Sequence, residues 1–507
     1  MRGALLVCIA FALTACATVD FDTPKPESYA APGNEDTYVG QRARELSRDH
    51  SGESGFFLIA DGVDAMGVRV SGAMLAERTL DAQYYLINDD MTSAIFISGL
   101  LAAADRGVRV RLLLDDMLTM GQDSGMLALD AHPNFEMRTF NPFANRTVRA
   151  WNFLTDFGRV NRRMHNKSFI VDNKMAVIGG RNIGDEYFAA RKDFNFGDLD
   201  VLTVGPVVNE ISAMFDLYWN HRLSVPASNV IDSRADQEAE LSRLRKRLGD
   251  QLQNIQKTRY ADLILDYLQA RLEPDDFDWV PYELVYDSPD KAIESRSDNA
   301  ASIRTPLAAS IESGKRELIV ISPYFVPTDG LIRGFRAMQA RGMDAIVITN
   351  SLAANNHSAV HAGYAPARKE LLEMGVKLYE VRPDALLLGV EKTGREDAVS
   401  TLHTKAFLVD RERFYLGSFN WDPRSAYLNT EMGIILEAPE TSESVAMRIE
   451  AALPDVAYRL ELDDQGKIIW IANDNGNERT YTKDPETGWW KRAWVSFVGI
   501  FPIEGQL

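Results

Sequence analysis

The chain has 507 residues, 46% of them hydrophobic and 25% charged, a composition ordinary for a folded protein with two domains or one large duplicated domain. Its net charge is −18, which becomes −19 without residues 1–15, because these contain Arg2 and no acidic residue. An acidic chain is repelled by nucleic-acid phosphates and by anionic lipids. The charge therefore argues against a nucleic-acid partner and against membrane binding by electrostatics alone.

The N-terminus is typical of a bacterial lipoprotein signal. Residues 4–13 form an apolar run too short to span a bilayer, and small residues then lead into Cys16. We expect residues 1–15 to be removed as a signal peptide and Cys16 to be acylated, with a plain secretory signal as the alternative. Since Cys8 would leave with the signal, the mature chain has no internal disulfide. The protein is predicted to be lipid-anchored in the bacterial cell envelope, and the non-acidic Ala17 favours the periplasmic face of the outer membrane.

Composition shifts divide the rest of the chain. A polar stretch with three early prolines predicts a flexible tether after the anchor, and alternating charges with leucines over residues 232–272 predict a helical connector with a solvated face. The predicted segments are the signal peptide 1–15, the tether 16–50, a first lobe 51–225, the connector 226–300, a second lobe 301–450 and a C-terminal segment 451–507.

A strand, a helix and a second strand occur in the same order in both halves. This order predicts a βαβ unit with parallel strands, and the helix is followed by an Arg-Gly turn in each copy, at Arg106-Gly107 and at Arg341-Gly342. The predicted elements are 80–87, 93–105 and 108–114 in the first copy and 317–322, 330–339 and 344–349 in the second. The sequence therefore predicts two similar α/β lobes, each with a mostly parallel sheet flanked by helices.

A motif with identical internal spacing follows each βαβ unit. Both copies read His-x-Lys-x4-Asp-x6-Gly-[Gly/Ser]-x-Asn, and the interval between the two histidines is close to the interval between the two Arg-Gly turns. The residues are His165, Lys167, Asp172, Gly180 and Asn182 in the first copy and His403, Lys405, Asp410, Ser418 and Asn420 in the second. In a strand, residues two apart share a face, so each histidine and lysine present together to one ligand. We predict one active site at the lobe interface, with a phosphate held between two imidazoles.

This pair of imidazoles suits phosphodiester exchange. One neutral imidazole attacks phosphorus to form a phosphohistidine, and the other, protonated, gives its proton to the leaving alkoxide. The lysines and asparagines hold the phosphate oxygens, Ser418 supplies a hydroxyl that Gly180 lacks, and no metal or cofactor is expected. We predict that Glu431 orients His403 and that Asp200, which has Asp198 two residues before it, orients His165. The residue types leave open which histidine is the nucleophile.

Two further segments are candidates for substrate or membrane contact. His357 and His361 share a helix face; zinc binding is less favoured there than a helix lining the head-group site, with His361 and Tyr364 near the substrate. After short strands near residues 468–471, the Trp489–Phe501 stretch combines three tryptophans with two basic residues. It predicts either an interfacial helix or a final helix packed on the core.

Residues 55–450 resemble the phospholipase D superfamily, whose mark is the duplicated His-Lys-Asp motif. Several stretches resemble one branch, the bacterial cardiolipin synthases, and its C type in particular. They are 80–85, 162–167, 179–184, 349–355, 361–364, 417–420 and 422–425. The resemblance implies that His165 is the nucleophile and that the enzyme transfers a phosphatidyl group to make cardiolipin. Its substrates would be phosphatidylglycerol and, as a second candidate, phosphatidylethanolamine. The alternatives are a phospholipase D-type hydrolase and, less favoured, a nuclease or a non-enzymatic envelope lipoprotein.

Overall fold

The computed structural model describes residues 18–232, 236–269, 271–294, 302–355, 357–383, 385, 399–474 and 476–499. The predicted signal peptide and Cys16 lie outside the described residues, as do Ile500 and Phe501 at the end of the predicted interfacial stretch. Within the described ranges, no helix is both long and apolar enough to cross a membrane.

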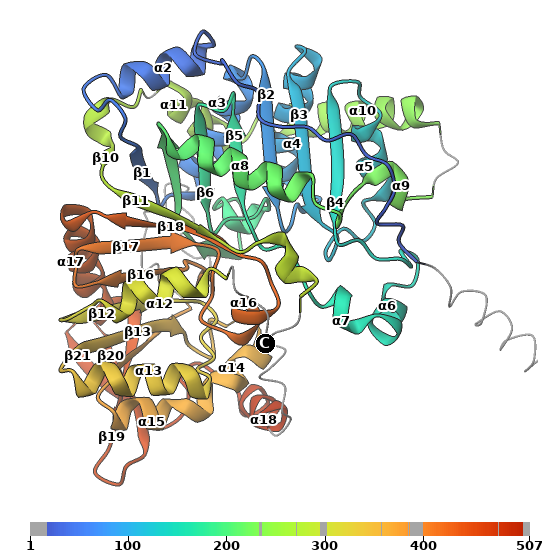
Figure 1. Cartoon of the computed structure of the whole chain (residues 1–507). Coiled ribbons are helices and arrows are strands. Elements are labelled where there is room, and N and C mark those ends of the chain that lie inside the picture. The colour runs from blue at the N-terminus through green and yellow to red at the C-terminus, as the bar shows by residue number, and fades with distance from the viewer. Residues whose placement is uncertain are drawn as a thin grey trace, which may run out of the picture.

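The chain forms two lobes, each built on one large sheet (Figure 1). The first sheet has nine strands in the order β10-β1-β8-β6-β5-β2-β3-β4-β9. Its strands are β1 (Gly55–Ile59), β2 (Thr79–Tyr84), β3 (Arg109–Asp115), β4 (Phe135–Phe140), β5 (Ser168–Val171), β6 (Met175–Gly179), β8 (Asp200–Val204), β9 (Ser224–Pro226) and β10 (Asp278–Trp279). The helices of this lobe are α2 (Tyr38–Leu46), α3 (Gly62–Leu75), α4 (Met91–Asp105), α5 (Asp123–Asp130), α6 (Arg149–Thr155), α7 (Phe157–Val160), α8 (Val207–Trp219), α9 (Ala227–Val230), α10 (Gln237–Ile255) and α11 (Arg259–Gln269).

The second lobe repeats this plan with a ten-stranded sheet in the order β11-β18-β17-β16-β12-β13-β14-β19-β20-β21. Its strands are β11 (Tyr282–Tyr286), β12 (Glu317–Ile321), β13 (Asp344–Asn350), β14 (Lys377–Val381), β16 (Ala406–Val409), β17 (Arg413–Gly417), β18 (Met432–Glu437), β19 (Ala457–Leu462), β20 (Ile468–Asp474) and β21 (Asn477–Tyr481). The helices are α12 (Arg304–Glu312), α13 (Asp329–Ala340), α14 (Ser358–Tyr364), α15 (Arg368–Glu373), α16 (Pro423–Tyr427), α17 (Pro439–Val456) and α18 (Trp489–Val498).

The two predicted βαβ units are confirmed. β2 pairs in parallel with β3 across α4, and β12 pairs in parallel with β13 across α13. Side-chain caps begin both helices: Asp90 accepts from the Ser93 N–H, and Thr328 accepts from the Leu331 N–H. The sheets are mixed rather than mostly parallel, because after β4 and β14 the chain continues in hairpins and antiparallel strands.

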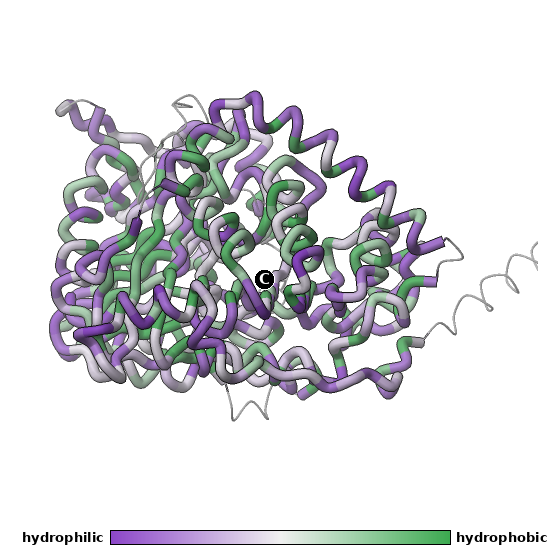
Figure 2. The backbone as a smooth tube through the Cα atoms, turned by 90° about the horizontal axis from the view of Figure 1, so that it is seen from above, coloured by the Kyte–Doolittle hydropathy of each residue, from purple (hydrophilic) through white to green (hydrophobic). Residues whose placement is uncertain are grey.

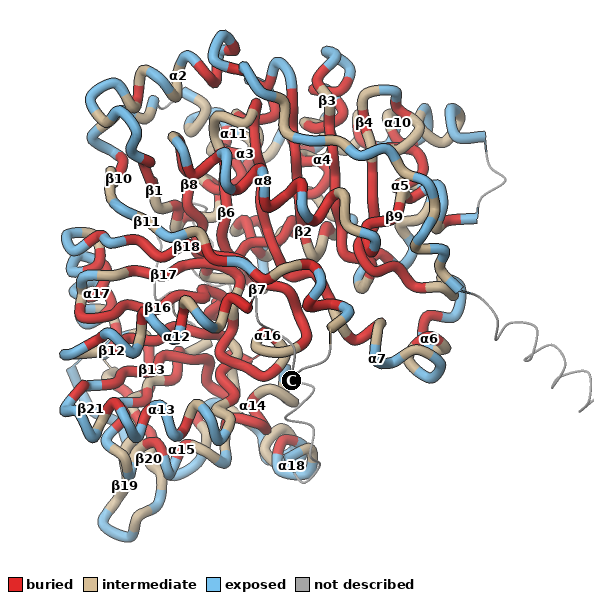
Figure 3. Tube along the Cα trace, in the orientation of Figure 1, coloured by how far each residue is buried: buried red, intermediate tan, exposed pale blue. Residues whose placement is uncertain are grey.

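The two sheets share a core at the lobe interface. One buried apolar cluster includes Ile178 and Phe215 from the first lobe and Ile321, Leu408 and Met432 from the second. Figure 3 shows buried strands in both lobes on either side of their junction, and Figure 2 shows hydrophobic strands inside and hydrophilic segments outside. Apolar burial of this kind stabilises the interface by about 25 cal/mol per Å². The lobes are therefore packed on each other around the motif residues.

Residues 18–50, expected to be a flexible tether, instead lie against the first lobe. The backbone of Ser28 bonds to Asn220 and Arg111, Lys25 bonds to Ser224 O at 2.5 Å, and Tyr38–Leu46 form a helix. The expected connector is helical at α10 and α11, as predicted, but these helices pack on the first lobe and not as an exposed link. The C-terminal strands β19–β21 complete the second sheet.

Candidate active site

Each motif histidine is fixed to the backbone of the opposite lobe. The His165 N–H donates to Thr430 O at 2.8 Å, and the His403 N–H donates to Gly197 O at 2.7 Å. Short parallel pairings extend these contacts. Met164 forms an isolated β-bridge with Thr430, and strand β15 (Val399–Leu402) pairs with strand β7 (Phe194–Gly197). The predicted site at the lobe interface is thus assembled by exchange of backbone hydrogen bonds between the two repeats.

The carboxylate partners of the histidines are also exchanged. His165 Nδ1 lies 2.8 Å from Glu431 Oε2, and His403 Nδ1 lies 2.6 Å from Asp198 Oδ2. The expected pairs, Glu431 with His403 and Asp200 with His165, are therefore wrong. Glu431 follows Thr430 and Asp198 follows Gly197, so each carboxylate comes directly after the carbonyl that holds the other lobe's histidine. Asp200 instead pairs with two buried arginines, Arg69 at 3.0 Å and Arg181 at 3.5 Å.

The surroundings of the two carboxylates differ at equivalent positions of the motif. This difference explains why the first motif has Gly180 where the second has Ser418. Ser418 Oγ donates to Glu431 at 2.5 Å, and Ser425 Oγ donates to the same carboxylate at 2.7 Å. The Ser418 hydroxyl, expected near the phosphate, is thus engaged with the histidine's partner. In the first lobe, a Cβ added to Gly180 would lie 2.2 Å from Asp198 Oδ1. Glycine is required there because the Asp198 carboxylate occupies that space.

The carboxylates at Nδ1 direct Nε2 of each ring toward the chemistry, and Lys405 Nζ lies 3.0 Å from His403 Nδ1 and 3.3 Å from His403 Nε2. A carboxylate at Nδ1 favours the tautomer with its proton there, so Nε2 carries the free lone pair. Aromatic rings restrict the imidazoles: Tyr85 packs on His165 and Tyr187 packs on His403, both with ring centroids 5.2 Å apart. His165 is 8% exposed and His403 4% exposed, so a small part of each residue is reached by solvent.

Four titratable groups of the motifs share one electrostatic environment. Burial lowers the pKa of His165 to about 4, of His403 to about 3, of Lys167 to about 7 and of Lys405 to about 8. Each lysine also lowers the pKa of the histidine from the opposite repeat. The crossed contacts of His165 with Glu431 and of His403 with Asp198 bring both predicted His-Lys pairs to one site, and this coupling agrees with them.

The charges of the two histidines, the two lysines and their carboxylates Glu431 and Asp198 sum to zero when both imidazoles are neutral and both lysines are charged. Burial alone would raise the pKa of Glu431 and Asp198, but the neighbouring histidines and lysines hold both pKa values below the ordinary range. Two ammonium and two carboxylate charges then cancel. A phosphodiester adds one negative charge to this water-poor site, which favours protonation of one imidazole. The proton needed by the leaving group can therefore be taken up together with the substrate.

We predict that a soluble phosphodiester takes up about one proton when it binds at pH 6. At that pH both lysines are charged and both histidines are neutral, because pH 6 lies below the lysine pKa values and above the histidine pKa values. Titration calorimetry in buffers of different ionisation enthalpy measures the uptake. Binding without proton uptake would contradict the charge-balance argument.

The two asparagines lie beside this cluster. Asn182 Nδ2 donates to the Tyr187 hydroxyl at 2.9 Å, and the Tyr187 ring packs on His403. The Asn420 N–H donates to Ser425 Oγ at 3.2 Å, and Ser425 contacts Glu431. Contact of either amide with the phosphate remains a prediction.

Asp172 and Asp410, the third members of the motifs, hold the fold and not the phosphate. Each begins the three-residue loop of a hairpin and has positive φ, 49° at Asp172 and 56° at Asp410. The Asp172 carboxylate accepts the N–H groups of Glu77, Arg78 and Thr79 at 2.8–3.1 Å, and Asp410 accepts the three equivalent N–H groups of residues 315–317. The motif predicts that both aspartates are catalytic residues. In the structure they instead hold the backbone at the starts of β2 and β12.

Asp172→Ala is expected to lower the free energy of unfolding by about 3 kcal/mol, because it leaves buried N–H groups without acceptors. Asp172→Asn, which keeps one oxygen, should lose about half as much. Urea unfolding measures both. An alanine variant that unfolds at the wild-type urea concentration yet has no turnover would contradict this structural role.

His361 and Tyr364 do not line the site. His361 is 1% exposed and its Nε2 lies 2.6 Å from an Arg368 nitrogen, while Tyr364 packs on Phe325 in the second-lobe core. The adjacent guanidinium also disfavours a metal cation at His361, and the described residues contain no group of three or more His, Cys, Asp or Glu that could hold a metal ion. Instead His357, just before α14, approaches the site, because Tyr324 packs on both His357 and His403.

Two positioning residues were missed in the sequence. Asp115 Oδ2 accepts the Met164 N–H at 2.8 Å, and Asn350 Oδ1 accepts the Leu402 N–H at 3.0 Å, so each holds the residue before a motif histidine. Burial raises the pKa of Asp115 to about 6. Asp115 ends β3 and Asn350 ends β13, the equivalent strands of the two βαβ units. The interval between them equals that between the two Arg-Gly turns, and this repeated interval was the signal that could have identified them.

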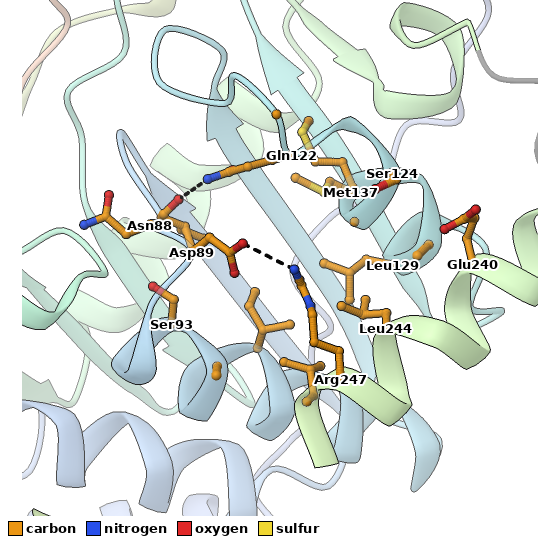
Figure 4. A pocket seen from close by; sticks show the side chains of 18 of the residues that line it. Asn88, Asp89, Ser93, Gln122, Ser124, Leu129, Met137, Glu240, Leu244 and Arg247 are labelled. Carbon is orange, nitrogen blue, oxygen red and sulfur yellow. Dashed lines mark hydrogen bonds and ion pairs between the residues drawn. The ribbon is translucent and has the colours of Figure 1, made fainter. Parts of the chain in front are cut away.

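A cavity of about 260 Å³ in the first lobe is separate from the histidines (Figure 4). It lies between the sheet residues Leu112 and Met137 and helix α10, and Arg247 pairs with Asp89 at its rim at 3.3 Å. Neither motif histidine lines it.

Comparisons with known proteins agree with this geometry. A family described as "Cardiolipin synthase, PLD-like domain" matches residues 74–219 and 307–453, one match in each lobe. Cardiolipin synthase C of Escherichia coli (strain K12) is 38% identical over 472 residues, which cover 91% of this chain and 98% of that protein. Cardiolipin synthase 2 of Bacillus cereus is 25% identical over 75% of this chain and 60% of its own length.

The fold is similar to a solved structure as well. Phosphatidylserine synthase of Haemophilus influenzae Rd KW20 superimposes with a TM-score of 0.56 over 83% of this chain and 92% of that chain, at 12% identity. A likeness at this identity supports the fold alone. The duplicated motif, the repeated match and the full-length similarity lead to one conclusion: the chain belongs to the family of cardiolipin synthases with phospholipase D-like domains.

Proposed function

We propose that the protein is a phosphatidyltransferase that makes cardiolipin through a phosphohistidine. The observation that carries the proposal is the crossed pair of contacts, His165 with Glu431 and His403 with Asp198, in one charge-balanced site. Two imidazoles held by carboxylates at Nδ1 serve a two-step displacement, and two lysines supply the positive charge for the phosphate oxygens.

In the first step, His165 Nε2 attacks the phosphorus of phosphatidylglycerol. The N–P bond forms, the P–O bond to the terminal glycerol breaks, and the His403 imidazolium gives its proton to that oxygen. In the second step, a hydroxyl of another phosphatidylglycerol loses its proton to His403 and attacks phosphorus. The N–P bond breaks, which yields cardiolipin and restores both rings. With phosphatidylethanolamine as donor, ethanolamine leaves instead.

The lipid anchor and location belong to the same proposal. Acylation of Cys16 would place the anchor just before Thr18, the first described residue, and the following segment bonds to the first lobe. The folded body would then be held close to the bilayer, on the periplasmic face of the outer membrane. The sequence of residues 1–17 supports this part of the proposal.

Incubation of the purified protein with defined vesicles tests the function. Phosphatidylglycerol alone, and mixed with phosphatidylethanolamine, should yield cardiolipin with release of glycerol or ethanolamine, as measured by lipid mass spectrometry. Phosphatidic acid as the only product would show hydrolysis and contradict the proposal. Absence of any phospholipid product would contradict both activities.

A further inference from the structure

The C-terminal helix α18 exposes an aromatic face that the described chain does not cover. Trp489 is 59% exposed, Trp490 72% and Trp494 58%. The helix is attached along a narrow opposite stripe, where Val495 packs with Leu352 and Ala362 from the second lobe. The structure thus combines the two predictions made for this stretch: one face packs on the protein, and the other presents large aromatic rings to the surroundings.

The composition of this helix fits a phospholipid surface. Residues 489–498 contain Lys491 and Arg492 and no acidic residue, although the whole chain carries a charge of −18. Tryptophan rings are favoured at the level of lipid head groups. Lys491 Nζ donates to Ala353 O at 3.3 Å and Arg492 donates to Thr487 Oγ1 at 3.0 Å, so the protein engages both basic side chains and the exposed face is aromatic. The three tryptophans and the absence of acidic residues in this helix therefore favour a bilayer over a protein surface.

Helix α18 lies near the active site. It packs on α14. His357, which precedes α14, contacts Tyr324, and Tyr324 contacts His403. In Figure 1, α18 and α14 border the corner between the two lobes. A lipid head group at α18 would thus lie on the part of the second lobe that also carries His357 and Tyr324.

The first lobe has exposed apolar side chains at the same corner. Leu154 in α6 is 78% exposed and Phe157 in α7 is 47% exposed, and α7 ends shortly before His165. Arg424 in α16 of the second lobe donates to the Asn161 side chain directly after α7, at 2.9 Å. Figure 1 shows α6 and α7 across the corner from α18. Each lobe therefore places apolar side chains beside its own motif.

We propose that α18, with α6 and α7 as a second contact, docks the protein on phospholipid bilayers and directs the site between the lobes toward the head groups. The aromatic rings of α18 enter the interface. The inference rests on the proposed lipid substrate for its purpose, but docking is measured separately from catalysis.

The test uses the full chain with Cys16→Ala, so that no acyl chain contributes. Trp489→Ser, Trp490→Ser and Trp494→Ser are combined in one variant. The matched control combines Tyr38→Ser, Leu265→Ser and Met447→Ser, which are similarly exposed on α2, α11 and α17. Binding is measured by flotation with vesicles of phosphatidylglycerol and phosphatidylcholine.

The tryptophan variant should lose about tenfold or more in partitioning, and the control less than about twofold. Brominated acyl chains should quench the tryptophan fluorescence of the unsubstituted chain, and the quenching should disappear in the tryptophan variant. Unchanged partitioning would overturn the proposal. So would a shift from dimer to monomer in sedimentation without a change in vesicle binding, which would assign the face to a second copy of the chain.

Turnover in detergent-mixed micelles separates this inference from the proposed function. The tryptophan variant should keep its micellar activity within about twofold, because α18 provides no reacting group. Absence of cardiolipin synthesis by the unsubstituted chain in micelles would contradict the proposed function and leave the docking result standing.

Discussion

His165→Ala and His403→Ala are each expected to lower kcat by about four orders of magnitude, because the nucleophile and the acid act as one unit. The two variants should differ with a phosphatidyl substrate that carries p-nitrophenol as its leaving group. This leaving group departs without a proton donor. His403→Ala should therefore recover the first step and show a burst of p-nitrophenol, whereas His165→Ala should not. Quenched-flow absorbance measures the burst.

His50→Ala is the matched control, since this histidine lies on the surface of the first lobe and stacks on Trp279. Its turnover should stay within about twofold of the unsubstituted chain. A burst in His165→Ala and none in His403→Ala would reverse the assigned roles. Substantial turnover in either variant would show that the two rings do not act on one phosphorus atom.

Glu431→Gln and Asp198→Asn are expected to lower kcat by about 10²- to 10⁴-fold, because the amide no longer stabilises the charged ring or fixes its tautomer. The crossed contacts make a specific prediction. Glu431→Gln should behave like His165→Ala and show no burst with the activated substrate, while Asp198→Asn should behave like His403→Ala and recover it.

Asp200→Asn supplies the comparison for these variants. Asp200 pairs with Arg69 and Arg181, so its substitution should lower the free energy of unfolding and leave the burst intact in the folded fraction. Urea unfolding of all three variants separates loss of fold from loss of chemistry. If Glu431→Gln recovered the burst and Asp198→Asn did not, each carboxylate would serve the histidine of its own repeat, contrary to the geometry.

Much of this architecture could be predicted from local pattern. Strand and helix periodicity identified both βαβ units, and the recurrence of one motif at nearly the same interval as the turns identified one shared site. These features are local, because they depend on the side chains of one segment. The mixed sheet order was not predicted, because strand direction depends on how hairpins return to the sheet. The packing of residues 18–50 depends on single hydrogen bonds to distant residues, such as those of Ser28.

The partners of the histidines could not be predicted from proximity along the chain. Glu431 follows His403 within the same repeat and is 266 positions away from His165, yet the backbone bond from His165 to Thr430 decides the pairing. Likewise, the identical spacing of Asp172 and Asp410 within their motifs suggested chemistry, whereas their carboxylates accept backbone N–H groups. Residues with the same spacing from a reactive group can thus serve the fold alone.

A crystal structure with bound orthovanadate tests the shared site most directly, because vanadate adopts the geometry of a phosphorus atom under attack. The expected result is one vanadium bonded to Nε2 of His165, with Nε2 of His403 in hydrogen-bond contact with an oxygen on the opposite side and both lysines on the remaining oxygens. Vanadate bound to a single histidine, with the other ring turned away and its Nε2 beyond hydrogen-bond reach of any vanadate oxygen, would contradict the account.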